Sequence, residues 1–109
     1  MSYDQGLAER IRARIGDHPA RSEREMFGGL AFMIGGNMAV GVNGDELMVR
    51  VGRSAHDEAV AKPGARTMDF TSRPMRGWIS VDARGFREDE ALDAWVDAGV
   101  SYAESLPAK

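Results

Sequence analysis

The glycine pairs at 28–29 and 35–36 are the first residues whose type and spacing suggest chemistry. A dinucleotide-binding loop needs G-x-G-x-x-G between a strand and a helix, so that backbone amides reach the pyrophosphate. The chain has no such spacing. Gly36 and Gly41 match the glycine spacing of a P-loop, but valine and asparagine follow them instead of Lys-Ser or Lys-Thr. We therefore interpret these glycines as turn and bulge residues, and we expect no cofactor.

A serine and two histidines are the candidates for nucleophilic or metal chemistry. Ser54 follows Gly52 as in a Gly-x-Ser-x-Gly elbow, but His56 stands where the second glycine of that motif belongs. Ser54 and Asp57 instead have the spacing of a capping box, which predicts a short helix capped by Ser54. His18 and His56 do not form an H-x-x-x-H pair, and the chain has no cysteine. We therefore expect no catalytic residue and no metal site.

The segment 66–87 holds a dense group of basic residues. It contains five arginines against two aspartates, with Phe70 and a tryptophan among them. Guanidinium groups pair bidentately with phosphate or carboxylate, and an exposed indole stacks on a nucleobase. The segment is therefore a candidate surface for anions or nucleic acid. The candidate binding residues are Arg66, Arg73, Arg76, Trp78 and Arg84.

The same segment also has a structural interpretation, which we favour. Residues 88–109 carry six acidic side chains and one lysine. If the arginines pair with this acidic segment and Trp78 packs the sheet on a helix, the segment 66–87 only stabilises the fold. The sequence alone does not decide between the two interpretations.

Length and composition restrict the class of protein. With 109 residues, 43% hydrophobic and 28% charged, the chain has the make-up of one soluble globular domain. A net charge of −3 argues against binding nucleic acid through overall charge. No apolar run approaches the ~20 residues of a membrane helix, and the N-terminus lacks the features of a signal peptide. We expect a single domain over residues 1–109 in the cytoplasm, away from the membrane.

The elements that must position these residues follow from periodicity. Residues 4–15 carry one apolar stripe and predict a helix. Between residues 26 and 51 an apolar period of two, with turn signals at 35–36 and 43–44, predicts three antiparallel strands. A short helix over 54–61, strands at 67–70 and 78–82, and an acidic helix over 88–106 complete the chain. The order α-β-β-β-α-β-β-α predicts an α+β fold, with an antiparallel sheet of about five strands and helices packed on one face.

Methionine is unusually frequent, with seven in the chain. Flexible thioether side chains fill irregular cores, and they also suit surfaces that adapt to partners. We favour core filling. If Met33 and Met48 face away from the first helix, an exposed sheet face could bind a second copy of the chain. Five of the methionines lie in the predicted strands or the loop after them: Met26, Met33, Met38, Met48 and Met75.

Several short motifs together resemble one known family. They are the segment Glu25 to Ile34 with its Met-Phe-Gly-Gly core, the stretch 36–40, the stretch 45–50, Pro-Gly-Ala-Arg at 63–66, Met-Asp-Phe at 68–70 and Arg-Pro-Met-Arg-Gly-Trp at 73–78. In this pattern the chain resembles the N-terminal domain of the TfoX/Sxy competence regulators, from about residue 3 to 107. The resemblance implies a small α+β domain with an antiparallel sheet.

The resemblance also implies a function without implying a catalytic site. Full-length members act as transcriptional co-activators of competence genes with the cyclic-AMP receptor protein, and they carry a second, C-terminal domain. We expect this chain to be a stand-alone, non-enzymatic regulatory or protein-interaction domain. Its partner would be an unidentified protein or a second copy in a homodimer. Weak nucleic-acid or anion binding through the segment Arg66–Arg87 is the alternative.

Overall fold

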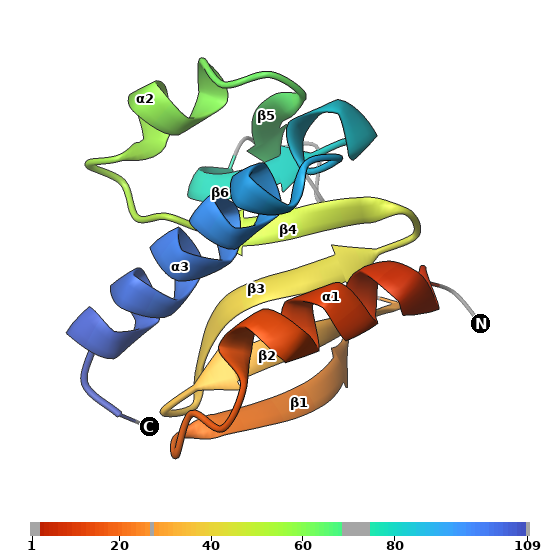
Figure 1. The fold of residues 1–109 in the computed structure, drawn as a ribbon. Helices are drawn as coiled ribbons and strands as arrows, with labels where there is room; N and C mark the ends of the chain where they lie inside the picture. The colour runs from red at the N-terminus through yellow and green to blue at the C-terminus, as the bar shows by residue number, and fades with distance from the viewer. Residues whose placement is uncertain (1–2, 27, 69–74, 109) are drawn as a thin grey trace.

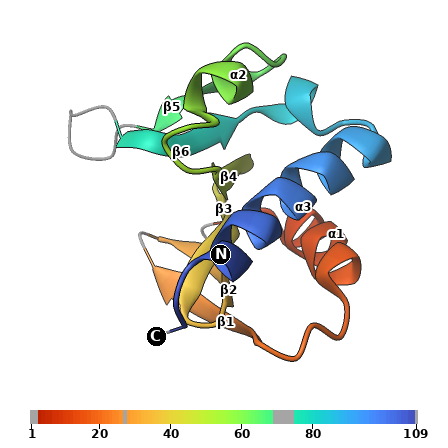
Figure 2. The same ribbon diagram turned by 90° about the vertical axis from the view of Figure 1, so that its left-hand side faces the viewer.

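The computed structural model describes residues 3–26, 28–68 and 75–108. In this part of the chain, strands form one antiparallel sheet, and two long helices lie on the same face of it (Figures 1 and 2). None of the described helices is both long and apolar enough to span a membrane. The elements are α1 (Gln5–Ile15), β1 (Arg21–Met26), β2 (Gly29–Ile34), β3 (Asn37–Asn43), β4 (Glu46–Arg50), α2 (His56–Val60), β5 (Ala65–Met68), β6 (Met75–Val81), the 3-10 helix η1 (Ala83–Gly85) and α3 (Asp89–Ser105).

The predicted α+β class and element order are confirmed, and the sheet has one strand more than we counted. Its described strands lie in the order β1-β2-β3-β4-β6-β5, and every neighbouring pair is antiparallel. The additional strand is β1, which pairs with β2 at the edge of the sheet. Its sequence, Arg-Ser-Glu-Arg-Glu-Met, has no alternation of apolar and polar residues that could reveal a strand. The prediction began the sheet at residue 26, where β1 ends.

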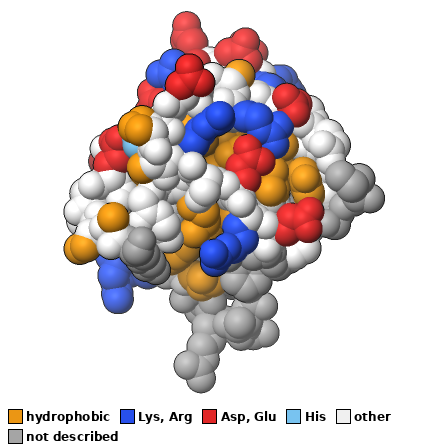
Figure 3. All heavy atoms as spheres, turned by 90° about the horizontal axis from the view of Figure 1, so that it is seen from below, with side chains coloured by type: hydrophobic (Ala, Val, Ile, Leu, Met, Phe, Trp, Pro, Cys, Tyr) orange, Lys and Arg blue, Asp and Glu red, His pale blue; other side chains and the backbone are white. Residues whose placement is uncertain are grey.

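The edge formed by β1 is strongly charged. Figure 3, which views the molecule from below, shows hydrophobic side chains flanked by basic and acidic ones. Phe32 and Ile15 line a hollow of about 300 Å³ beside β1. The guanidinium of Arg12 lies 5.8 Å from the centroid of the Phe32 ring and donates to Glu23 on β1 at 2.8 and 2.9 Å. Charged side chains of this kind discourage further strands from pairing with an edge.

The main core lies between the sheet and helices α1 and α3. Leu7, Ala8 and Ile11 of α1 are buried there, as are the apolar residues along one face of α3. Gly99 brings α3 close to β3, because a Cβ at this position would lie 2.4 Å from the carbonyl oxygen of Ala39. The helix therefore crosses the sheet at a contact that only glycine permits.

Two arginines of α1 form ion pairs with acidic side chains of α3. Arg14 donates to Asp97 at 2.6 and 2.9 Å, and Arg10 donates to Asp89 at 3.1 Å. At the far end of α3, Nε2 of His18 lies 2.7 Å from a carboxylate oxygen of Glu104. The structural interpretation of the segment 66–87 named the wrong partner, because the arginines that pair with α3 in the described part of the chain are Arg10 and Arg14 of α1.

Helix α2 is held by a buried histidine and not by the predicted serine cap. The N-cap residue is Ala55, and no side chain caps the helix. The backbone N–H of Gly77 donates to Nδ1 of His56 at 2.9 Å. Since Nδ1 accepts this bond, the ring proton sits on Nε2, which donates to Oγ1 of Thr67 at 2.9 Å. His56 thus fastens α2 to both β5 and β6, and Ser54 has no capping role.

Candidate functional site

Of the candidate binding arginines, the three that the structure describes each pair with a carboxylate. Arg76 donates to both oxygens of Asp57 on α2, at 3.1 Å each. Arg84 on η1 donates to both oxygens of Asp82, at 3.2 and 2.9 Å. Arg66 likewise donates to both carboxylate oxygens of Glu46, at the start of β4. The remaining candidate, at position 73, lies outside the described residues.

These ion pairs occupy the groups that an anion would use. The hydrogen bond from Arg76 is the main cause of a lowered pKa at Asp57, and that from Arg84 has the same effect on Asp82. Both carboxylates are therefore ionised at neutral pH. A phosphate would have to displace an intramolecular carboxylate at each position. Arg84 and Arg66 both lower the pKa of Asp82, whereas Arg76 pairs with a carboxylate of α2.

Trp78 lies on the face of the sheet that carries no described helix. It is half-buried and packs at the margin of a methionine cluster. The guanidinium of Arg50 lies over its ring, 4.9 Å from the centroid. The structural interpretation expected the indole to pack the sheet on a helix. This expectation is wrong, because the ring lies on the other face of the sheet. One face of the ring is already covered, which leaves less of it to stack on a nucleobase.

The methionine cluster fills space on the same face. Met33 and Met48 do face away from α1, as binding of a second copy would require, but their side chains are only 8% and 1% exposed. Core filling is therefore the role the geometry supports. Beside the cluster lies a groove of about 390 Å³ whose rim includes the Glu46–Arg66 pair. The buried members of the cluster are Ala31, Met33, Met38, Met48 and Met68.

An apolar groove on the helical side is the better candidate for binding. It has a volume of about 370 Å³ and runs between α2 and α3. Its floor includes Val51, Ala59 and Trp95, which are between 4% and 8% exposed. The indole N–H of Trp95 donates to the carbonyl oxygen of Gly85 at 3.1 Å, which fixes the ring in the floor. The groove is lined by Val51, Ala55, Glu58, Ala59, Lys62, Trp95, Ala98, Ser101, Tyr102 and Ser105.

Two cations lie over aromatic rings that line this groove. The ammonium of Lys62 is 4.9 Å from the ring centroid of Trp95. The guanidinium of Arg50 is 5.4 Å from the ring centroid of Tyr102, and it also lies over Trp78. Neither cation forms an ion pair with any residue that the structure describes. Both remain able to accept an acidic group from outside.

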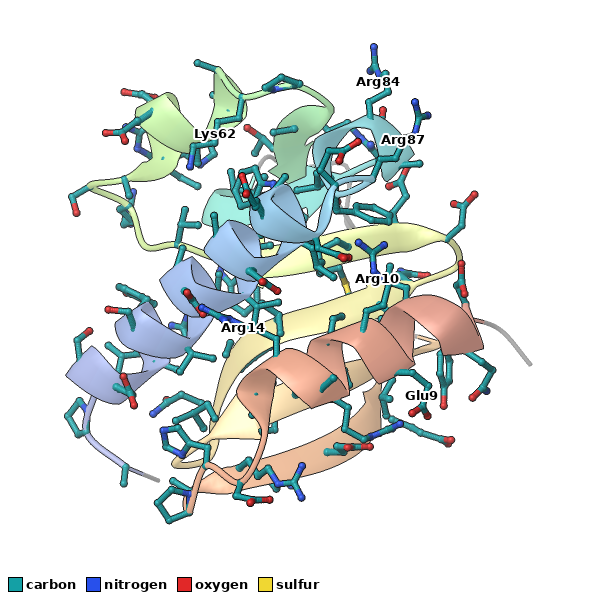
Figure 4. The ribbon with its side chains drawn as sticks, in the orientation of Figure 1. Glu9, Arg10, Arg14, Lys62, Arg84 and Arg87 are labelled. Atoms are coloured by element: carbon teal, nitrogen blue, oxygen red, sulfur yellow. The ribbon has the colours of Figure 1, made fainter. Side chains whose placement is uncertain are left out.

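The groove continues past Lys62 toward the start of α3. A smaller hollow of about 170 Å³ shares Lys62 and Trp95 with it and extends to Arg84 and Ala94. Figure 4 shows Lys62 on one side of α3 and Arg10 and Arg14 on the other. The side of α3 that lines the groove is thus separate from the side that forms ion pairs with α1.

The arrangement is suited to binding. An apolar floor with small side chains on one wall accepts a complementary apolar surface, and polar groups around it are typical of a binding site. Among the described residues there is no group of three or more acidic or histidine side chains placed to hold a metal ion. Sequence periodicity missed the groove, because Trp95 has the spacing of a core residue and the groove needs both α2 and α3. The small residues Ala98, Ser101 and Ser105 beside the core stripe were the available signal.

The comparisons with known proteins identify the domain type. A family model described as the TfoX N-terminal domain matches residues 14–103, which is most of the chain. No curated protein and no solved structure matches the chain.

Proposed function

The chain belongs to the TfoX N-terminal domain family, a family of regulatory domains, and from this premise we propose that it works by binding a protein partner in the groove between α2 and α3. The proposed role is regulatory and non-enzymatic. We further propose that the process is the control of competence genes, since the family resemblance points there. The partner would be a protein of that regulatory machinery, and the process would be intracellular.

The groove is the observation that carries the proposal. A protein-binding site needs an apolar centre with polar groups around it, and hot-spot residues there are enriched in tryptophan, tyrosine and arginine. The groove has Trp95 in its floor and Tyr102 in its wall. The sheet face offers less, because its methionines are buried.

Nucleic-acid binding is supported less well by the same geometry. Protein cations bind a phosphate backbone by releasing the counterions of the nucleic acid. Each candidate arginine of the segment 66–87 that the structure describes already has a carboxylate partner. The net charge of −3 adds long-range repulsion. We therefore retain a protein partner as the proposal.

Site-specific photocrosslinking tests the proposal. A photoreactive amino acid at Ser101 would lie in the groove, and the same group at Ser22 on β1 would lie outside it. In cells of the source organism, we expect a discrete adduct from position 101 and none of the same mass from position 22. Ala98→Trp should abolish the adduct by filling the groove, whereas the matched control Ala20→Trp, at an exposed turn, should not.

The identity of the adduct decides what the partner is. An adduct of two copies of the chain would make a homodimer the bound form, and a heterologous adduct would name another protein. Identical adducts from positions 22 and 101, or an adduct that survives Ala98→Trp, would contradict the groove as the binding site.

A further inference from the structure

We infer that Met75 is a site of reversible oxidation, and that its sulfoxide form loosens helix α2, which is one wall of the groove. The packing of the methionine cluster and the bonds that hold α2 carry the oxidation and the loosening. Only the effect on partner binding rests on the proposed function.

The methionine side chains that the structure describes all lie on one face of the sheet. Four of them are buried in the methionine cluster, and Met75 packs against this cluster from its margin. The core on the other face is filled by branched aliphatic and aromatic side chains and contains no described methionine. Core filling alone does not require this separation, because thioethers adapt to either core. The arrangement concentrates the described thioethers, which peroxides oxidise, on the face that carries no described helix.

Exposure distinguishes Met75 from the other four. The four buried methionines are between 1% and 8% exposed, whereas Met75 is only partly buried. In the oxidation, sulfur attacks one oxygen of hydrogen peroxide, an S–O bond forms as the O–O bond breaks, and the departing hydroxide takes the remaining proton and leaves as water. Sulfur is oxidised and peroxide is reduced. Methionine sulfoxide reductases reverse the change with electrons from a thiol, so the modification is reversible.

The sulfoxide disturbs the end of the pairing between β5 and β6. Met75 is the first residue of β6 and lies opposite Met68, the last residue of β5, beside a register shift. The side chains of the buried cluster members are methionine and alanine, which offer no hydrogen-bond donor to an S=O group. The oxidised side chain therefore leaves the cluster, and Met68 loses a cross-strand neighbour. Because β5 has four residues and lies at an edge of the sheet, this end of the strand separates easily.

The residues next to this methionine pair hold α2 in place. Thr67 precedes Met68 on β5, and its hydroxyl accepts from Nε2 of His56 at 2.9 Å. Gly77 lies two residues after Met75 on β6 and donates its N–H to Nδ1 of His56 at 2.9 Å. Helix α2 therefore depends on the end of the β5–β6 pairing that carries the methionines, and the three elements lie side by side in Figure 2.

Helix α2 has little stability of its own to resist this change. It has five residues and no side-chain cap, and so short a helix is unstable in isolation. Arg76 of β6 also pairs with Asp57 of α2, but both side chains are exposed, and exposed ion pairs contribute little. Glu58 and Ala59 of α2 line the groove. Loosening of β5 and β6 therefore reaches the wall of the groove through His56.

Peroxide treatment followed by site-resolved mass spectrometry tests the modification site. The full chain is treated with dilute hydrogen peroxide, and fragmentation of its peptides reports the sulfoxide at each of the five methionines compared. We expect Met75 to be oxidised several-fold faster than each of the four buried methionines, and methionine sulfoxide reductase to restore it. A buried methionine that is oxidised as fast as Met75, or a Met75 that does not react, would overturn the assignment.

Hydrogen exchange tests the loosening of α2. When only Met75 among the five is oxidised, exchange at the N–H of Ala59, which donates to the carbonyl of Ala55, should be several-fold faster than in the reduced protein. Met75→Leu keeps the apolar volume and removes the sulfur, so peroxide should no longer speed this exchange. The matched control Met33→Leu, on β2, should retain the effect of peroxide. Met75→Gln places a polar group at the site and should speed the exchange without oxidation.

Two results would contradict the link between Met75 and α2. One is unchanged exchange at Ala59 when Met75 is fully oxidised. The other is a peroxide effect on Ala59 that persists in Met75→Leu while the buried methionines stay reduced. Either result would show that the end of the β5–β6 pairing does not control the helix.

The crosslink from position 101 separates this inference from the proposed function. The purified photoreactive protein, reduced or oxidised at Met75, is crosslinked in an extract of the same cells. We expect the adduct to decrease on oxidation and to recover after treatment with the reductase. An adduct that persists unchanged beside a loosened α2 would overturn the control of binding. Absence of an adduct from the reduced protein would refute the proposed function, whereas the oxidation and exchange measurements decide the modification and the loosening independently.

Discussion

At the scale of single residues, His56 shows how a group with catalytic potential serves the fold. Its two ring nitrogens are both used, one by the backbone N–H of Gly77 and one by Thr67. The side chain is only 6% exposed. Neither nitrogen is left to accept a proton from a substrate, so the histidine acts as a link between α2 and the sheet.

Replacing this histidine should weaken the domain. His56→Ala leaves the N–H of Gly77 and the hydroxyl of Thr67 without their partner in a buried place, and it removes packing. We expect the free energy of unfolding to fall by about 2 to 4 kcal/mol. His56→Asn retains an acceptor near the position of Nδ1 and should lose less. Denaturant titration measures both, and an alanine variant as stable as the parent would refute the role assigned to the ring.

The basic and aromatic residues illustrate what sequence reading finds at this scale and what it misses. Arg66, Arg76 and Trp78 were selected because their types suit anion binding, and the structure gives each a partner within the fold. Arg50 and Lys62 were not selected, because their importance depends on rings from a distant helix. Residue type suggests what a side chain can bind, whereas only tertiary contacts show whether it is already occupied.

At the scale of elements, the strongly periodic segments could be predicted from sequence. The helix over residues 88–106 and the strands bounded by tight turns at 35–36 and 43–44 are confirmed, because local periodicity and turn glycines determine them. Strand β1 could not be predicted, because its charged sequence has no apolar alternation. It is a strand only through its pairing with β2 at the edge of the sheet. The predicted cap of α2 was also wrong, because the N-cap is Ala55 and no side chain caps the helix, which is instead linked to β6 by the bond from Gly77 to His56.

The contact of α3 with β3 gives a prediction at this scale. In Gly99→Ala the added Cβ would lie 2.4 Å from the carbonyl oxygen of Ala39 and 2.8 Å from Cγ1 of Val40, so α3 must move away from the sheet. We expect a loss of about 2 kcal/mol in stability, although alanine favours helix by about 1 kcal/mol over glycine. Ser101→Ala, at an exposed position of the same helix, serves as the control. A stabilised Gly99→Ala would show that the helix does not approach this closely.

The pairing of α1 with α3 predicts acid sensitivity. Hydrogen bonding to Arg14 is the main cause of a lowered pKa at Asp97. A carboxylate whose pKa is lowered on folding contributes stability above its ordinary pKa and loses it as pH falls through the lowered value. Unfolding free energy should therefore decrease below about pH 4. Because Asp97 is half exposed, its share should be below about 1 kcal/mol, and Asp97→Asn should flatten that part of the curve. An unchanged curve in this variant would contradict the assignment.

At the scale of the whole molecule, the domain has one helical side with a groove and one sheet side without described helices. The paired arginines and the negative net charge predict how it behaves with nucleic acid. On a size-exclusion column with light scattering, we expect no co-elution with short nucleic acid at low salt. Co-elution that Arg66→Ala and Arg76→Ala remove would instead make the segment 66–87 a binding surface.

The most direct test of the groove is chemical-shift mapping of the isotope-labelled domain with the partner that photocrosslinking identifies. We predict that the perturbed amides lie along the two helices that form the groove, at residues such as Ala59, Lys62, Ala98 and Ser101. Shifts confined to β1, or to the sheet face around Glu46 and Ser80, would contradict the account and move the binding surface away from α2 and α3.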